Sequence, residues 1–158
     1  MPLTDWEPLA AGEDPRVVLN IGSAIEELKR VDDACERFAR MAGLDEDSAH
    51  AFGIAVREAA ANAIKHGNAG DDRKRVHIEF DIPNENGRSC VRVRVRDEGA
   101  GFDPSCVPDP LAPSNVSATS GRGIFLMRAF MDEVAVVQAP SGTEIVMRKT
   151  FSRPSNPA

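Results

Sequence analysis

Cysteine is scarce in this sequence, and its copies suit neither a disulfide framework nor a zinc site. Cys35, Cys90 and Cys106 are odd in number, widely spaced and without a CxxC pair or companion histidines. Disulfide frameworks use paired cysteines, and zinc sites use clusters of Cys and His. This usage is typical of a reducing compartment.

Long apolar runs are absent as well. No segment approaches the roughly 20 apolar residues that span a bilayer. Residues 1–14 also lack the basic start and apolar stretch of a secretory leader. We therefore expect a cytoplasmic protein with no membrane segment.

Basic residues are fewer than acidic ones, and the formal net charge is -6. The one basic stripe alternates with valines, as on the solvent face of a half-buried strand. A surface for nucleic acid or anionic membranes needs a basic patch, so neither partner is expected. The stripe consists of Arg88, Arg92, Arg94 and Arg96.

Two nucleotide-binding fingerprints are missing. The sequence has two Gly-x-Gly pairs, but Pro104 takes the last position of GxGxxG in the first and Leu126 takes it in the second. No GxxxxGK[ST] occurs. These absences exclude a Rossmann dinucleotide site and a P-loop.

The periodic segments that are present predict one α+β domain over residues 15–151, between a flexible arm at 1–14 and a disordered tail at 152–158. Ser23 and Glu26 have the spacing of a capping box, and Gly67 is placed to cap the C-terminus of a helix. The predicted helices cover residues 24–42, 45–65 and 121–130, and the predicted strands cover residues 16–21, 75–81, 89–97, 134–139 and 144–147.

The middle predicted helix carries two polar side chains on one face. Glu58 and Asn62 stand four residues apart among alanines, which would let a ligand come close. Such a pair suits one proton acceptor and one oxygen ligand for Mg²⁺. Taken alone, such a pair is more often a solvated glutamate and a helix-interior asparagine than a ligand site.

A further polar position ends a predicted hairpin strand. Asp97 continues the parity of the apolar valines, so we expect it on the buried side, where it must find donors or line a cavity. Gly99 and Gly101 follow and permit a turn in which backbone approaches a ligand closely.

Residues 102–120 form a long segment with neither helical nor strand periodicity, and it contains four prolines. Loops of this length are often lids. Gly121-Arg122-Gly123 then opens the last helix, where free N–H groups and the helix dipole favour a phosphate.

In this order the motifs resemble the N, G1, G2 and final boxes of the GHKL ATPase superfamily. The short length, the Glu in the first position and the run from Phe130 to Val134 are most similar to bacterial anti-sigma-factor serine/threonine kinases. The resemblance covers residues 17–151 and implies a two-layer α/β sandwich, with a mixed, mainly antiparallel sheet covered on one face by about three helices. The boxes read Glu58-x-x-x-Asn62-Ala63-x-x-His66-Gly67, Asp97-x-Gly99-x-Gly101, Gly121-x-Gly123 and Gly142-Thr143.

The resemblance also implies roles for single residues. Asn62 would bind Mg²⁺, Asp97 would accept the adenine amino group and Thr143 would support the adenine end. Glu58 would be the base that takes a proton from the attacking hydroxyl. Arg122 is a candidate for the γ-phosphate, with a solvated loop arginine as the alternative. Lys65 and His66 are weaker candidates for phosphate contact, because a Lys-His pair at a helix end is favourable without any ligand. The residues implied to shape the pocket and the lid are Gly99, Gly101, Gly121 and Gly123.

The function implied is a protein serine/threonine kinase that uses ATP and Mg²⁺. Its substrate would be a STAS-domain anti-anti-sigma factor, and a kinase homodimer would hold a sigma factor inactive. One alternative is a non-catalytic, ATP-dependent binding switch. The presence of Glu58 favours catalysis over this switch but does not decide between them. A third is the ATP-binding half of a histidine kinase, disfavoured because no phospho-accepting hairpin precedes Arg16 and His50 lies within the domain's own helix.

Overall fold

The structure is a computed structural model that describes residues 16–83, 90–99, 120–139 and 142–151. The predicted arm at 1–14, the tail at 152–158 and residues 102–119 of the predicted lid lie outside these ranges. Arg88, Gly101 and Cys106 lie outside them too. Within the described ranges, no helix is both long enough and apolar enough to cross a membrane.

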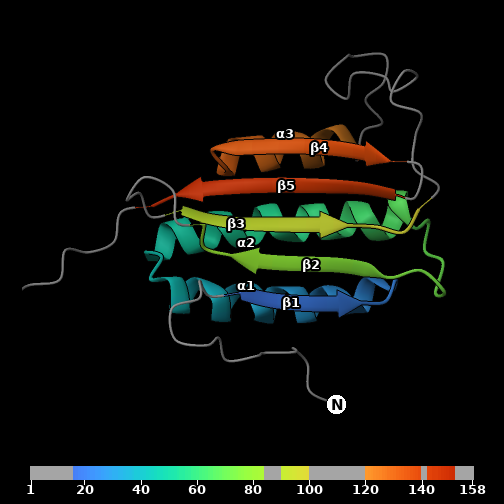
Figure 1. The fold of residues 1–158 in the computed structure, drawn as a ribbon, viewed down its shortest axis with the longest axis horizontal. Coiled ribbons are helices and arrows are strands. Elements are labelled where there is room, and N and C mark those ends of the chain that lie inside the picture. The colour runs from blue at the N-terminus through green and yellow to red at the C-terminus, as the bar shows by residue number, and fades with distance from the viewer. Residues whose placement is uncertain (1–15, 84–89, 100–119, 140–141, 152–158) are drawn as a thin grey trace, which may run out of the picture.

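One sheet and three helices form two layers (Figure 1). The helices α1, α2 and α3 lie side by side over the same face of the sheet. The strand order is β1-β2-β3-β5-β4, and each neighbouring pair among the described strands is antiparallel. The predicted α+β sandwich is therefore confirmed. The elements are β1 (Arg16–Ile21), α1 (Leu28–Ala42), α2 (Glu46–Asn62), β2 (Val76–Asp81), β3 (Cys90–Arg96), α3 (Ser120–Phe130), β4 (Glu133–Ala139) and β5 (Gly142–Thr150).

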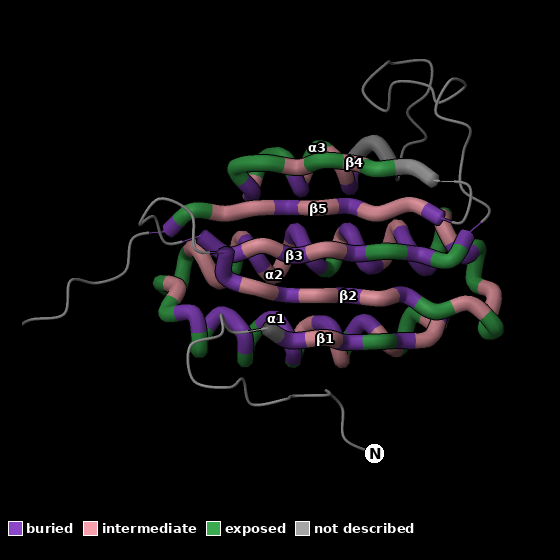
Figure 2. Tube along the Cα trace, viewed as in Figure 1, coloured by how far each residue is buried: buried purple, intermediate pink, exposed green. Residues whose placement is uncertain are grey.

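The core lies between the two layers. Along β2 every second residue is buried (Figure 2). Successive side chains of a strand point to opposite faces, so the apolar side chains of β2 lie on the face that the helices cover. Three phenylalanine rings meet there, with the centroid of Phe80 at 5.3 Å from that of Phe38 and 6.0 Å from that of Phe52. Aromatic pairs at such distances stabilise a core beyond the area that they bury.

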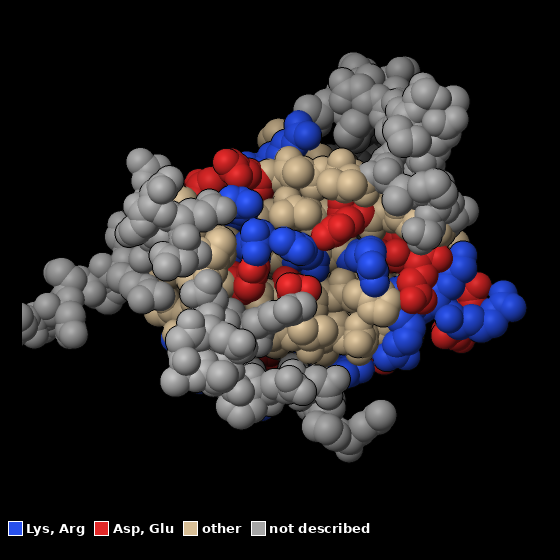
Figure 3. All heavy atoms as spheres, viewed as in Figure 1, with Lys and Arg blue, Asp and Glu red and all other residues tan. Residues whose placement is uncertain are grey.

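The opposite face of the sheet is charged (Figure 3). The predicted solvent-facing arginines of β3 lie on it, with Arg92 and Arg94 half-buried and Arg96 exposed. Arg92 donates from Nε to Oδ1 of Asp81 at 2.9 Å, across to β2. The basic stripe of the sequence is thus interleaved with carboxylates on the neighbouring strand.

Helix starts follow the sequence only in part. The sequence offers Asp45 or Asp47 as the cap of α2, and the structure has Asp45, whose Oδ2 accepts the N–H of Ser48 at 3.1 Å. The predicted capping box at Ser23 is wrong. Its hydroxyl donates to the carbonyl of Lys74 at 2.7 Å, and the chain enters α1 through a 3-10 turn that no side chain caps. The hydroxyl of Ser23 thus bonds to a distant backbone carbonyl and not to the helix start that the local sequence pattern predicted.

The end of α2 also differs from the prediction. After Asn62 the helix widens into a π-helical turn, Ala63–Gly67, and the N–H of Asn68 donates to the carbonyl of Ala63 at 2.8 Å. Gly67 does not have the left-handed conformation of a glycine cap; that conformation occurs at Ala69 (φ 52°) and Gly70 (φ 70°). Such π turns occur often at functional sites.

Candidate nucleotide-binding site

Asp97 is held by backbone donors at the end of β3. It is 6% exposed, on the buried parity as predicted. Its Oδ1 accepts the N–H groups of Gly99 and Thr143, both at 3.0 Å. Its own N–H donates to the carbonyl of Thr143 at 3.0 Å. Backbone hydrogen bonds therefore hold Oδ1 in place, and this orientation of the carboxylate puts Oδ2 beside Gly67.

Three glycines make room for this carboxylate. A β-carbon on Gly67 would lie 2.0 Å from Oδ2 of Asp97, and one on Gly99 would lie 2.1 Å from the carbonyl oxygen of Gly67. A β-carbon on Gly142, whose φ is 148°, would lie 2.3 Å from the carbonyl oxygen of Asp97. Each glycine is required because another chain segment occupies the space of a side chain. For Gly67 this requirement replaces the predicted role as a helix cap.

A pocket of about 160 Å³ opens beside Asp97. Its walls are mostly apolar, and its few polar groups come from the ends of the flanking elements. A narrow apolar slot with one fixed acceptor suits a flat heteroaromatic ring that carries an amine. The apolar lining residues are Ala63, Val95, Ile124, Val136 and Ile145, the polar ones are Asn62, His66, Asp97 and Thr143, and Gly67 completes the wall.

A second cluster forms where α2 passes the first turn of α3. A β-carbon on Gly123 would lie 2.8 Å from Nδ2 of Asn62 and 3.3 Å from Oε2 of Glu58. Both polar side chains therefore turn toward the helix start that was predicted to favour phosphate. Gly121 and Arg122 lie in the same turn of α3, but the side chain of Arg122 is not among those that the structure describes.

The cluster fits Mg²⁺ that arrives with a nucleotide. Among the described residues, no group of three His, Cys, Asp or Glu side chains could hold a metal ion. In nucleotide sites, however, Mg²⁺ is bound by one or two protein oxygens together with phosphates and water. The carboxamide of Asn62 contains one oxygen of this kind, and the carboxylate of Glu58 lies next to the same glycine.

The two basic residues of the π turn are placed differently. Both are exposed, but His66 borders the pocket whereas Lys65 is not among its lining residues. The structure thus brings His66, Asn62, Asp97 and Thr143 together around one cavity and leaves Lys65 at the surface.

Residues 21–149 match the family described as histidine kinase-like ATPase domain. The chain belongs to this ATPase family. An anti-sigma F factor from Oceanobacillus iheyensis is 34% identical over 101 residues, 62% of this chain and 66% of that protein. A serine-protein kinase RsbW from Listeria monocytogenes is 30% identical over 117 residues, 70% of this chain and 71% of that protein. The chain thus spans about two thirds of the length of these relatives.

A solved structure supports the fold of this ATPase family member. The RsbU and RsbW domains of a Mycobacterium tuberculosis protein superpose with a TM-score of 0.66 at 18% identity, over 90% of this chain and 34% of that chain. The predicted resemblance to GHKL ATPases and anti-sigma kinases is confirmed by these comparisons. The roles of single residues stay predictions.

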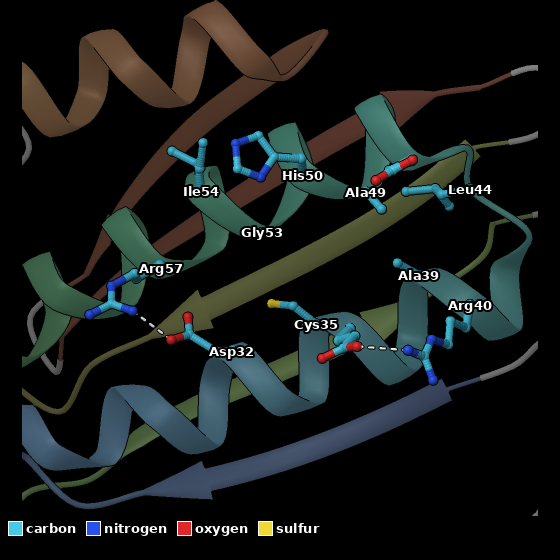
Figure 4. Close-up of a pocket in the computed structure, with 12 residues that line it drawn as sticks. Asp32, Cys35, Ala39, Arg40, Leu44, Ala49, His50, Gly53, Ile54 and Arg57 are labelled. Atoms are coloured by element: carbon cyan, nitrogen blue, oxygen red, sulfur yellow. Dashed lines mark hydrogen bonds and ion pairs between the residues drawn. The ribbon is translucent and has the colours of Figure 1, made fainter.

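A larger hollow, of about 780 Å³, lies between α1 and α2 (Figure 4). Arg57 of α2 pairs with Asp32 of α1 across it, and Arg40 pairs with Glu36 along α1. Cys35 is buried at this hollow, and burial raises the pKa of its thiol, so the sulfur is a poor nucleophile. With both arginines already paired to carboxylates, the hollow is less suited to a nucleotide of this ATPase family than the pocket at Asp97.

Sequence reasoning missed a polar network next to Asp97. Asn68 is buried, and Oδ1 of its side chain accepts the N–H of Glu98 at 2.8 Å. Hydrogen bonds from His77 and from the N–H of Arg75 hold the pKa of Glu98 below its usual value. No local signal marks Asn68, because the sequence there resembles an ordinary polar turn after a helix.

Proposed function

We propose that this chain is an anti-sigma factor that acts as a protein serine/threonine kinase. It would bind ATP with Mg²⁺, phosphorylate a STAS-domain anti-anti-sigma factor and hold a sigma factor inactive. The enzyme class has direct support in relatives of 30% and 36% identity named serine-protein kinase RsbW. The observation that carries the proposal is Asp97, whose Oδ1 is fixed by two backbone N–H groups beside an apolar slot.

At the base end, the carboxylate oxygens of Asp97 serve as hydrogen-bond acceptors, so they favour a ring with an outward-facing N–H₂ group. The fixed backbone donors keep Oδ2 in one orientation before the nucleotide arrives. Val95 and Ile145 supply apolar surface for the ring from the sheet, and Thr143 borders the same end of the slot. The chain thus recognises adenine with little reorganisation, which limits the entropic cost of binding.

At the phosphate end, Glu58 and Asn62 have separate tasks. Glu58 would accept the proton of a serine or threonine hydroxyl of the substrate. The hydroxyl oxygen then bonds to the γ-phosphorus of ATP, while the bond from that phosphorus to the β,γ-bridging oxygen breaks and ADP is released. Asn62 would hold Mg²⁺, which when bound offsets the negative charge of the phosphates. N–H groups at the start of α3 add a favourable dipole for the same charges.

The remaining parts of the proposal concern partners. The name of the relative from Oceanobacillus iheyensis, an anti-sigma F factor, supports a sigma factor as one binding partner. The anti-anti-sigma factor rests on the resemblance to anti-sigma-factor kinases. We further propose a homodimer in the cytoplasm, with no nucleic-acid or membrane partner. Gly99, Gly101, Gly121 and Gly123 would shape the pocket and the lid, with Arg122 and Lys65 as candidates for phosphate contact.

The direct test is incubation of the protein with Mg²⁺-ATP and a STAS-domain protein encoded beside it, followed by detection of phosphoserine or phosphothreonine. We expect transfer by the wild type. Glu58→Gln should slow transfer by about 10²- to 10⁴-fold, the usual contribution of a general base, and leave ATP affinity nearly unchanged. ATP binding without any transfer by the wild type would contradict the kinase and favour the ATP-dependent switch.

A further inference from the structure

Asn68 is a buried polar side chain near Asp97 that the proposed mechanism does not use. It is 1% exposed. Its Nδ2 donates to the hydroxyl oxygen of Ser23 and to the carbonyl of Arg75, both at 3.0 Å, and its Oδ1 accepts the N–H of Glu98 at 2.8 Å. A buried carboxamide that is satisfied at both ends fixes the relative positions of the segments it joins.

These segments are the ones that meet at the base end of the pocket. Asn68 directly follows Gly67, and Glu98 directly follows Asp97. The hydrogen bond between Asn68 and Glu98 therefore lies one residue away from the tight packing of Gly67 against Asp97. A β-carbon on Gly67 would there lie 2.0 Å from Oδ2 of Asp97. Little displacement of the helix end or the strand end is compatible with that packing.

The hydrogen bonds form a closed ring outside the pocket. After Asn68, two left-handed residues turn the chain back, so that the N–H of Arg75 donates to Oε1 of Glu98 at 2.7 Å. Arg75 also accepts from Asn68, which in turn accepts from Glu98. None of these three residues lines the pocket. The ring therefore acts on a nucleotide indirectly, through the end of the π turn and the end of β3, where Asp97 lies.

We propose that Asn68 is a positioning residue for selection of the nucleotide base. Its carboxamide sets the distance between the end of the π turn and the end of β3, and so aims Oδ2 of Asp97 at the amine of the ring. This inference rests on the proposed role of Asp97 as the acceptor for adenine. It does not depend on phosphoryl transfer.

The test compares dissociation constants of the full chain for ATP and for inosine triphosphate, measured by calorimetry. Inosine has a carbonyl oxygen where adenine has an amine, so a correctly aimed Asp97 should discriminate against it. We expect the wild type to prefer ATP by about tenfold or more, the value of one hydrogen bond to a charged group. Asn68→Ala should weaken ATP binding, leave the binding of inosine triphosphate nearly unchanged and reduce the preference by about fivefold or more.

Two further variants separate positioning from general damage to the fold. Ser23→Ala removes another partner of Asn68 but keeps the bond to Glu98, so the preference for ATP should stay near that of the wild type. Asn68→Asp keeps an acceptor for the N–H of Glu98, so it should retain most of the preference even if it lowers stability. This variant gives a result even if Asn68→Ala does not fold.

The outcomes distinguish the two proposals. A wild type that binds both nucleotides equally would overturn the role of Asp97, and the inference with it. A wild type that discriminates, with an unchanged preference in Asn68→Ala, would overturn the inference alone. Equal weakening of both nucleotides in Asn68→Ala, or loss of the preference in Asn68→Asp, would also overturn it, because a general structural defect would then explain the data.

Discussion

The base end of the pocket, around Asp97, is built from backbone, whereas the phosphate end, around Glu58 and Asn62, is built from side chains. At the base end two N–H groups hold one carboxylate oxygen, and glycines from three segments surround the carboxylate. At the phosphate end two half-buried side chains of α2 face one glycine of α3.

This difference suggests how the two ends respond to change. Backbone that is packed against backbone cannot move aside without shifting a strand or a helix, so the base end should be preformed and intolerant. A long side chain can change rotamer at modest cost, so the phosphate end should adapt when nucleotide and Mg²⁺ arrive. Substitutions of matched size at the two ends should therefore have unequal effects.

The largest effect is expected for Gly67→Ala. Its methyl group would occupy the position of Oδ2 of Asp97 and displace the acceptor, which costs about 1.5–3 kcal/mol, or roughly 10- to 100-fold in ATP affinity. The matched control is Gly53→Ala in α2, where a β-carbon meets nothing within 4 Å. It should bind ATP normally and raise helix stability by about 0.5–1 kcal/mol. Calorimetric titration of both variants decides the point, and equal ATP affinity would show that the base end is not preformed.

How far the sequence predicts this site depends on the range of the interactions. Alternation along β3 was enough to place Asp97 on the buried side, and helical spacing was enough to put Glu58 and Asn62 on one face. Both are local patterns, and the fold preserves them. The order of the motifs carried the family resemblance, and that resemblance supplied the number of layers.

Tertiary contacts explain what the sequence did not predict. Ser23 has the spacing of a helix cap, but its hydroxyl bonds to a carbonyl 51 residues away. Gly67 follows a helix and was predicted to cap it, but its missing side chain accommodates the carboxylate of Asp97. Asn68 resembles any turn residue, because its partner Glu98 is 30 residues away and no local pattern encodes that contact.

A smaller effect is expected for Gly123→Ala at the phosphate end. The added methyl group would lie 2.8 Å from Nδ2 of Asn62, the far end of a side chain that can rotate at a cost of about 0.5–1.5 kcal/mol. ATP affinity in the presence of Mg²⁺ should fall by about two- to tenfold, and affinity in EDTA should hardly change. Gly67→Ala, in contrast, should lose the same factor in both conditions. A Mg²⁺-independent loss in Gly123→Ala would remove Asn62 from the metal site.

The smallest effect concerns pH and the hydrogen bonds behind the base end. Hydrogen bonds from His77 and the N–H of Arg75 lower the pKa of Glu98 in the folded state. The stabilisation they provide is complete above the ordinary pKa of a glutamate, about 4.3, and is lost as the pH falls through the lowered value. Glu98→Gln keeps the shape without the charge, so its urea midpoint should fall less than that of the wild type between pH 5.5 and pH 3 and run parallel to it above pH 6. Parallel curves over the whole range would mean that the exposed carboxylate of Glu98 contributes nothing, and that the backbone N–H of Glu98 alone ties the base end to Asn68.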